Sequence, residues 1–221
     1  RYPVGLQTFS ELREKNDLYI DKTAYVCEMA HALKYYICVL ATVLFLTPMV
    51  FAQQQDPIRI LYIGNSYTYY HDLPQMVQSI AANIAQDFRM KIDYKAYTPG
   101  GCTFKRHLQQ PEEMAAIREG HWDYVVLQEQ SSLPAMPTEV VQHETYPYAR
   151  QLDSLVHVHN PRARVIFYMT WGHKDGCQET PDGYPLISTY QGMQTRLITS
   201  YLEMTYQNDA WCAPVGMVWQ R

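Results

Sequence analysis

A serine that could act as a nucleophile follows an apolar stretch in the middle of the chain. Residues 58–63 read Ile-Arg-Ile-Leu-Tyr-Ile, and Gly64, Asn65 and Ser66 come directly after them. The apolar stretch predicts a buried strand, and a glycine at its end allows a sharp turn that exposes the Ser66 hydroxyl. Turns use Gly-Asn-Ser constantly, so the position just beyond a strand is what favours a catalytic role.

Two further polar segments stand at the ends of predicted strands. Gly101 follows the alternating stretch 92–97, and its N–H can face a developing oxyanion without side-chain obstruction. Gln128 and Gln130 follow the apolar stretch 122–127, where a neutral amide is a good oxyanion donor. A plain loop glycine and a polar strand cap are the alternative interpretations. Three such segments after successive strands favour one shared site.

Strand-like and helix-like stretches alternate from residue 56 onward, which predicts parallel strands joined by helical crossovers. The predicted strands are residues 58–63, 92–97, 122–127, 163–169 and 211–216. The predicted helices are residues 73–88, 104–118, 138–157 with a break at Pro147, and 190–206. The expected fold is a three-layer α/β/α sandwich with a mainly parallel sheet. Sites in such sheets lie at the carboxyl ends of the strands.

The composition is that of a globular protein, because 47% of the 221 residues are hydrophobic. The net charge is −4 and no long Lys/Arg run occurs, so a nucleic-acid partner is not expected. The five cysteines form no CxxC pair or His/Cys cluster, and neither zinc nor any other cofactor is expected.

The chain divides into three unlike pieces, predicted at residues 1–36, 37–55 and 56–221. In the second piece, an apolar run of about 15 residues follows Lys34 and ends near Ala52, a pattern typical of a secretory signal peptide. A buried core helix is the alternative interpretation. The signal interpretation predicts a periplasmic or secreted protein that meets a membrane only through residues 34–52.

The first piece contains "YPVGLQTFSELRE", "LYIDKTAYV" and "HALKYY". It resembles the start of the bacterial AAA-ATPase-like family. In that family a phosphate-binding loop ending in Gly-Lys-Ser/Thr comes next, and residues 37–52 contain none, so ATP binding is not expected. A signal peptide behind 34 residues suggests a composite chain, in which a fragment of one gene is joined near residues 33–36 to the signal peptide of another.

The third piece contains "ILYIGNSYTYYHDLP", "PGG", "YVVLQEQSSLP", "MTWG" and "APVGMVW". Residues 58–221 resemble the SGNH/GDSL hydrolase superfamily, and more closely its secreted Bacteroidetes-type subfamily of unassigned function. The resemblance implies that Ser66 is the nucleophile and donates one N–H to the oxyanion, and that Gly101 is the second donor. The family's third donor is an Asn side chain, for which Gln128 and Gln130 are the two candidates here.

The family also has a DxxH segment after the strand that ends in "APVG", and the sequence stops at Arg221 without one. The domain is therefore expected to be incomplete at its C-terminus and impaired, since a serine hydroxyl needs an adjacent base. His71 and His173 are candidate substitutes.

The resemblance predicts a carboxylic ester hydrolase for acyl esters, acetyl esters above all, with small molecules or carbohydrates as substrates. The alternatives are a non-catalytic carbohydrate-binding or inert module on the same fold, and a protein related to the AAA-ATPase-like family through residues 1–36.

Overall fold

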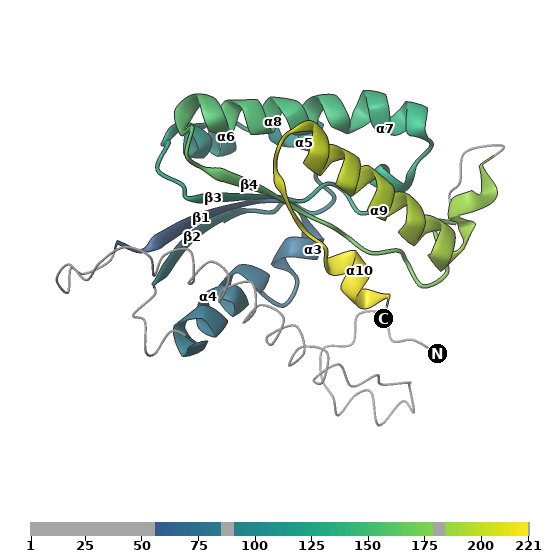
Figure 1. The fold of residues 1–221 in the computed structure, drawn as a ribbon, viewed down its shortest axis with the longest axis horizontal. Coiled ribbons are helices and arrows are strands. Elements are labelled where there is room, and N and C mark those ends of the chain that lie inside the picture. Colours follow the sequence, from purple (N-terminus) through teal and green to yellow (C-terminus); the bar gives the residue numbers. More distant parts are fainter. Residues whose placement is uncertain (1–55, 85–90, 179–183, 221) are drawn as a thin grey trace. The chain divides into compact units, whose positions relative to one another are not determined.

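A computed structural model describes residues 56–84, 91–178 and 184–220 of the chain (Figure 1). The described residues belong to one compact unit, Gln55–Arg221. The predicted AAA-ATPase-like fragment at 1–36 lies outside them, as does the predicted signal segment at 37–55.

The centre of the domain is a five-stranded sheet with the order β2-β1-β3-β4-β5. All neighbouring strands in it are parallel. The strands are β1 (Ile58–Ile63), β2 (Ile92–Tyr97), β3 (Tyr124–Leu127), β4 (Arg164–Tyr168) and β5 (Trp211–Ala213). Because each parallel connection must cross over the sheet, helices separate the strands along the chain.

Helices cover both faces of this sheet, with α4 on one face and α6 and α8 on the other (Figure 1). The helices are α3 (Ser66–Tyr69), α4 (Leu73–Ile84), α5 (Phe104–His107), α6 (Pro111–Arg118), α7 (Thr138–Glu144), α8 (Tyr146–His159), α9 (Tyr190–Gln207) and α10 (Val215–Trp219). Two short 3-10 helices, η2 (Leu133–Ala135) and η3 (Pro185–Ser188), lie between them. The domain is the α/β/α sandwich with a parallel sheet that the sequence predicts.

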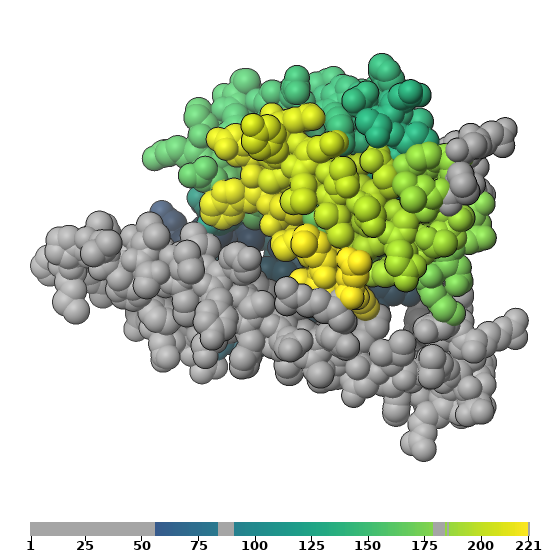
Figure 2. Space-filling model, turned by 45° about the vertical axis from the view of Figure 1, so that its right-hand side comes forward, coloured from purple at the N-terminus to yellow at the C-terminus, as the bar shows by residue number. Residues whose placement is uncertain are grey.

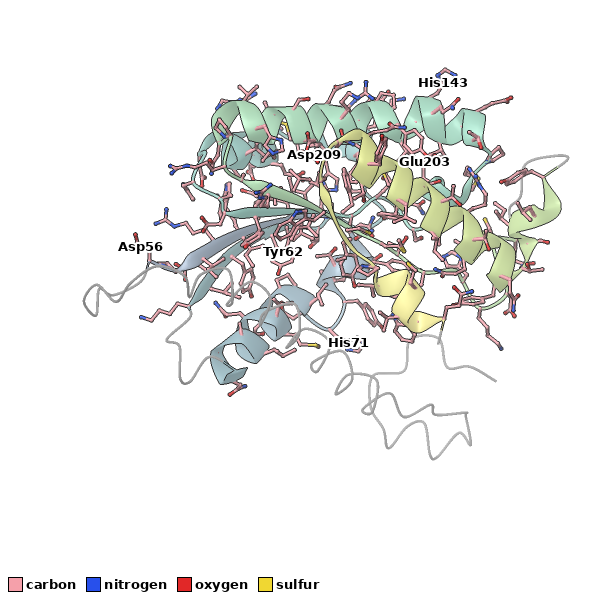
Figure 3. All side chains as sticks on the ribbon, in the orientation of Figure 1. Asp56, Tyr62, His71, His143, Glu203 and Asp209 are labelled. Carbon is pink, nitrogen blue, oxygen red and sulfur yellow. The ribbon has the colours of Figure 1, made fainter. Side chains whose placement is uncertain are left out.

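Alternate residues of the central strands enter two separate cores. Leu61 and Ile63 of β1 are fully buried in the larger core, which the helices α5, α6, α8 and α9 complete. Ile60 and Tyr62 point to the opposite face and pack with Val126 of β3. Figure 3 shows Tyr62 on the side of the sheet where α4 lies. Each large apolar side chain buried in this way contributes about 1.5–3 kcal/mol.

Several predicted boundaries differ from the structure. The helical stretch 104–118 is divided into α5 and α6, and β3, β4 and α9 differ from their predicted bounds by one or two residues. Two further differences involve prolines. The helical stretch 138–157 breaks at Thr145 and not at Pro147, which lies in the first turn of α8. Proline fits there because the first N–H groups of a helix have no partner within the helix. The last strand ends at Ala213 and not at residue 216, since Pro214 cannot donate to the strand ladder and α10 begins at Val215.

The last described segments pack beside α9. Figure 2 shows the yellow surface of β5 and α10 next to the yellow-green surface of α9. In the part of the chain that the structure describes, no helix combines the length and apolar character that a membrane span requires.

Candidate active site

The carboxyl ends of three strands are aligned by the register of the sheet. Ile63, the last residue of β1, is the register partner of Tyr97 in β2 and of Leu127 in β3. The segments that follow these residues therefore leave the sheet side by side. They carry the predicted site residues: Ser66 after β1, Gly101 after β2, and Gln128 and Gln130 after β3.

Asn65 joins all three segments. Its backbone N–H donates to Gln128 Oε1 at 2.9 Å, and its Nδ2 donates to the carbonyl oxygen of Cys102 at 3.0 Å. Its Oδ1 accepts from Gln128 Nε2 at 2.9 Å and from the N–H of Tyr67 at 3.2 Å. With 2% of its surface exposed, Asn65 fixes the backbone at Ser66 between the segment after β2 and the end of β3.

Ser66 is the first residue of α3 and is half-buried. Its backbone N–H has no hydrogen-bond partner among the described residues, and the same is true of the N–H of Gly101. Gly101 is exposed and has a φ of +63°, a left-handed conformation that favours glycine. Both N–H groups that are predicted to face an oxyanion therefore lack a hydrogen-bond acceptor among the described residues.

The two candidate glutamines have different surroundings. Gln128 is fully buried, and its Nε2 donates to Asn65 Oδ1 and to the carbonyl oxygen of Glu129. Its Oε1 also accepts from the Thr68 hydroxyl at 2.9 Å. Gln130 is half-buried and accepts at Oε1 from the N–H groups of Ser132 and Leu133, each at 2.9 Å.

The side-chain amide hydrogens of Gln130 have no partner within the described ranges, while those of Gln128 are both occupied. This geometry places Gln128 as the residue that holds Asn65. It leaves Gln130 as the one of the two with amide hydrogens available to a ligand.

Gly64 is required by the close approach of Gln128. A Cβ atom at position 64 would lie 2.5 Å from Thr68 Oγ1 and 2.8 Å from Gln128 Oε1. Both distances are shorter than real Cβ contacts, so a side chain would displace the groups that hold Asn65. The glycine before Asn65 and Ser66 thus serves packing as well as the turn.

Glu129 is a carboxyl group at the site that the sequence interpretation did not single out. It is fully buried, and its Oε1 accepts from the N–H of Phe104 at 3.1 Å and of Gln130 at 2.7 Å. Burial raises the pKa of Glu129 to about 8, and these hydrogen bonds only partly oppose the shift. An acidic residue between two site candidates at a strand end was the available sequence signal.

Aromatic rings continue from Ser66 across the same edge of the sheet. The ring of Tyr67 lies 4.6 Å from that of Trp171, which follows β4, and the ring of Trp171 lies 5.3 Å from that of Trp219 in α10. Trp122, by contrast, is buried and donates to the carbonyl oxygen of Ala116 at 2.7 Å. Trp122 therefore belongs to the core.

The two candidate substitute bases differ in exposure. His71 is exposed and its ring meets that of Tyr70 edge-on at 4.7 Å, on the α4 side of the sheet (Figure 3). His173 follows Trp171 and is half-buried, and desolvation lowers its pKa, which favours the neutral form that a base needs. Among the described residues neither histidine is hydrogen-bonded to Ser66. In the same residues no three His, Cys, Asp or Glu side chains gather as metal ligands do.

Comparison with known families gives one match, and it lies outside the described residues. Residues 3–40 match the family described as Predicted AAA-ATPase. This confirms the resemblance predicted for the start of the chain. No curated protein sequence matches the chain.

Solved structures similar to this chain include lipases and esterases. The lipase/acylhydrolase from Enterococcus faecalis is 13% identical, with 73% of this chain and 78% of that chain covered and a TM-score of 0.49. The psychrotrophic esterase EstA from Pseudoalteromonas sp. is 12% identical, with 70% and 75% covered and a TM-score of 0.45.

An acetyl xylan esterase, AlAXEase, is 11% identical, with 70% of this chain and 76% of that chain covered and a TM-score of 0.40. The sheet and the helices described above establish the α/β/α fold of this chain without these likenesses.

Proposed function

We propose that residues 56–221 are a serine esterase domain with Ser66 as its nucleophile. One observation carries the proposal: Asn65 is hydrogen-bonded to Cys102 and to Gln128, and so holds Ser66 between the two segments that bear the other candidate residues. Catalysis of acyl transfer needs this arrangement, in which a nucleophile stands beside N–H groups that can hold a negative oxygen.

The proposed reaction follows from the groups present. Ser66 Oγ attacks the acyl carbonyl carbon as its proton passes to a base, and the tetrahedral oxyanion accepts from the N–H groups of Ser66 and Gly101. Gln130 is the proposed third donor, and Gln128 keeps Asn65 in place. The alcohol leaves with a proton, and water then attacks the acyl-enzyme, releasing the acid and restoring the Ser66 hydroxyl.

The proposed substrates are esters of small acyl groups, acetyl above all, with carbohydrates as the alcohol. The aromatic row Tyr67–Trp171–Trp219 supports this choice, because it begins next to the nucleophile and offers apolar ring faces with a hydroxyl at one end. The signal-like segment at residues 34–52 adds the proposal that the reaction takes place in the periplasm or outside the cell.

The proposed reaction needs a base that takes the proton from Ser66 Oγ. Since no histidine of the described residues is hydrogen-bonded to Ser66, we expect slow turnover. Soluble imidazole is then expected to act as an external base and to raise the rate.

The test is p-nitrophenyl acetate hydrolysis by the purified chain, with and without imidazole, beside the Ser66→Ala variant. Imidazole also cleaves this ester directly, so the rate without protein is subtracted. The expected result is turnover that imidazole increases and that Ser66→Ala loses. Equal rates for the two proteins under both conditions would contradict the proposal.

The same row of rings favours one alternative, a carbohydrate-binding module without catalysis. Titration with xylan and with acetylated xylan, followed by tryptophan fluorescence, separates the two functions. Binding with no release of acetate supports the module, whereas release of acetate supports the esterase.

A further inference from the structure

The carboxyl group of Glu129 connects two strand ends that are not neighbours in the sheet. Strand β1 lies between β2 and β3. Nevertheless the N–H of Phe104, in the segment after β2, donates to both oxygens of Glu129, at 3.1 and 3.2 Å. The same carboxyl accepts from the N–H of Gln130, at the end of β3, at 2.7 Å. A single side chain thus spans the end of β1.

The two backbones held in this way carry proposed oxyanion donors. Phe104 lies three residues after Gly101, and the intervening Cys102 accepts the hydrogen bond from Asn65. Gln130 is itself the proposed third donor. The carboxyl of Glu129 therefore fixes the distance between the segment that contains Gly101 and the backbone of Gln130. The hydrogen bonds of Asn65 to Cys102 and Gln128 fix the positions of these two segments relative to Ser66.

The surroundings of this carboxyl contain no positive partner among the described residues. The titratable groups that face it are the Cys102 thiol, from the segment after β2, and the Tyr201 hydroxyl, from α9. Burial raises the pKa of both, so both are neutral near pH 7. The two N–H groups favour the charged carboxylate, but burial without a positive partner opposes them more strongly and favours the neutral acid.

We propose that Glu129 is a positioning residue for the esterase reaction, which holds the oxyanion donors Gly101 and Gln130 in place as a neutral carboxylic acid. The inference rests on the proposed function of Ser66. It goes beyond it by assigning a role to a side chain that does not touch the reacting atoms. Ionisation of Glu129 would place a negative charge close to the developing oxyanion, so the neutral form is the one that supports the reaction.

The variants Glu129→Gln and Glu129→Ala separate this role from a general structural one. Glutamine keeps a carbonyl oxygen for the N–H groups of Phe104 and Gln130 and cannot ionise. For the parent protein we expect kcat to fall above pH 8. We expect Glu129→Gln to retain kcat and to lack that fall. Alanine is expected to lower kcat about 10²-fold, the size of losing one oxyanion donor, with little change in KM.

The matched control is Glu119→Gln, which removes an exposed carboxylate that pairs with Lys95 at 3.1 Å. It should leave kcat and its pH profile unchanged. An alkaline fall in kcat that persists in Glu129→Gln, or a loss in Glu129→Ala that appears only in KM, would overturn the proposal.

A second measurement does not depend on activity. Amide hydrogen exchange at Phe104 and Gln130 should be slow in the parent protein and in Glu129→Gln. It should be at least about tenfold faster in Glu129→Ala under conditions where all three are folded. The absence of esterase activity in the parent protein would reject the function proposed for Ser66. Unchanged amide exchange at Phe104 and Gln130 in Glu129→Ala would reject the role of Glu129.

Discussion

Asn65 and Gln128 are hydrogen-bonded to each other twice. The N–H of Asn65 donates to Gln128 Oε1 and Gln128 Nε2 donates to Asn65 Oδ1, both at 2.9 Å and across 63 residues of sequence. Both side chains are buried. This pair connects the end of β1 to the end of β3 and fixes the residue before the proposed nucleophile, so its loss should affect stability and activity together.

Gln128→Ala is predicted to lower the free energy of unfolding by about 2–4 kcal/mol, because it leaves buried groups of Asn65 and Thr68 without partners. Urea denaturation followed by circular dichroism measures the loss. The control is Gln109→Ala, an exposed glutamine, for which we expect a change within about 0.5 kcal/mol. Similar values for the two variants would contradict the role assigned to the Asn65–Gln128 pair.

Substitution by alanine is predicted to change the stability of the domain at one glycine near the site and not at another. At Gly64 the added Cβ meets Thr68 Oγ1 and Gln128 Oε1, so Gly64→Ala should cost about 1–3 kcal/mol of stability through overpacking. At Gly100 no atom lies within 4 Å of the added Cβ, and Gly100→Ala should be nearly neutral. Thermal unfolding of both variants tests the difference. A neutral Gly64→Ala would show that the Gln128 side chain lies elsewhere.

Because Glu129 has a raised pKa in the folded domain, we expect the stability of the domain to fall as the pH rises. Its pKa in the folded domain, about 8, is above the ordinary value of 4.5, so the folded state binds this proton more tightly than the unfolded state does. The stabilisation is complete below about pH 4.5 and is lost as the pH rises through 8.

The parent protein should therefore lose stability between pH 5 and pH 9 relative to Glu129→Gln, by an amount on the order of a few kcal/mol. Urea denaturation of both proteins at each pH measures the difference, with Glu112→Gln, at an exposed carboxylate, as the control whose difference from the parent protein stays constant. Curves for the parent protein and Glu129→Gln that run parallel across this range would contradict the burial of an unpaired carboxyl.

A buried pair behind the Gly101 segment gives a further prediction. His107 Nδ1 and Glu113 Oε2 lie 2.5 Å apart, and both side chains are almost completely buried. Glu113→Ala should cost about 3–5 kcal/mol, since it leaves the imidazole buried without its partner. Its neighbour Glu112 is exposed, and Glu112→Ala should change stability by less than about 0.5 kcal/mol. Equal effects in chemical denaturation would show that the pair contributes nothing.

The sequence was sufficient to predict the sheet and the three segments that carry the candidate site residues. An apolar run defined β1 and an alternating stretch defined β2, both to the residue, and the parallel arrangement then followed from the alternation of strands and helices. Gly101 and Gln130 could be predicted as candidates because both follow strand ends.

The contacts between these segments could not be predicted from the sequence. That Gln128 holds Asn65 through both its amide oxygen and its amide nitrogen, and that Glu129 reaches Phe104, depends on the register of strands far apart in the chain. The same limit applies to Trp122. Its place in a predicted strand does not say what it contacts, and the hydrogen bond to Ala116 places it in the core.

The central claim, that the Ser66 hydroxyl is an activated nucleophile beside oxyanion donors, is tested most directly by covalent trapping. The purified chain is incubated with a fluorophosphonate probe, with imidazole present as a soluble base, and the adduct is located by mass spectrometry of peptides. The account predicts one adduct at Ser66, formed much more slowly in Gln128→Ala and absent in Ser66→Ala. Modification at another residue, or a Ser66 no more reactive than Ser131 or Ser132, would contradict it.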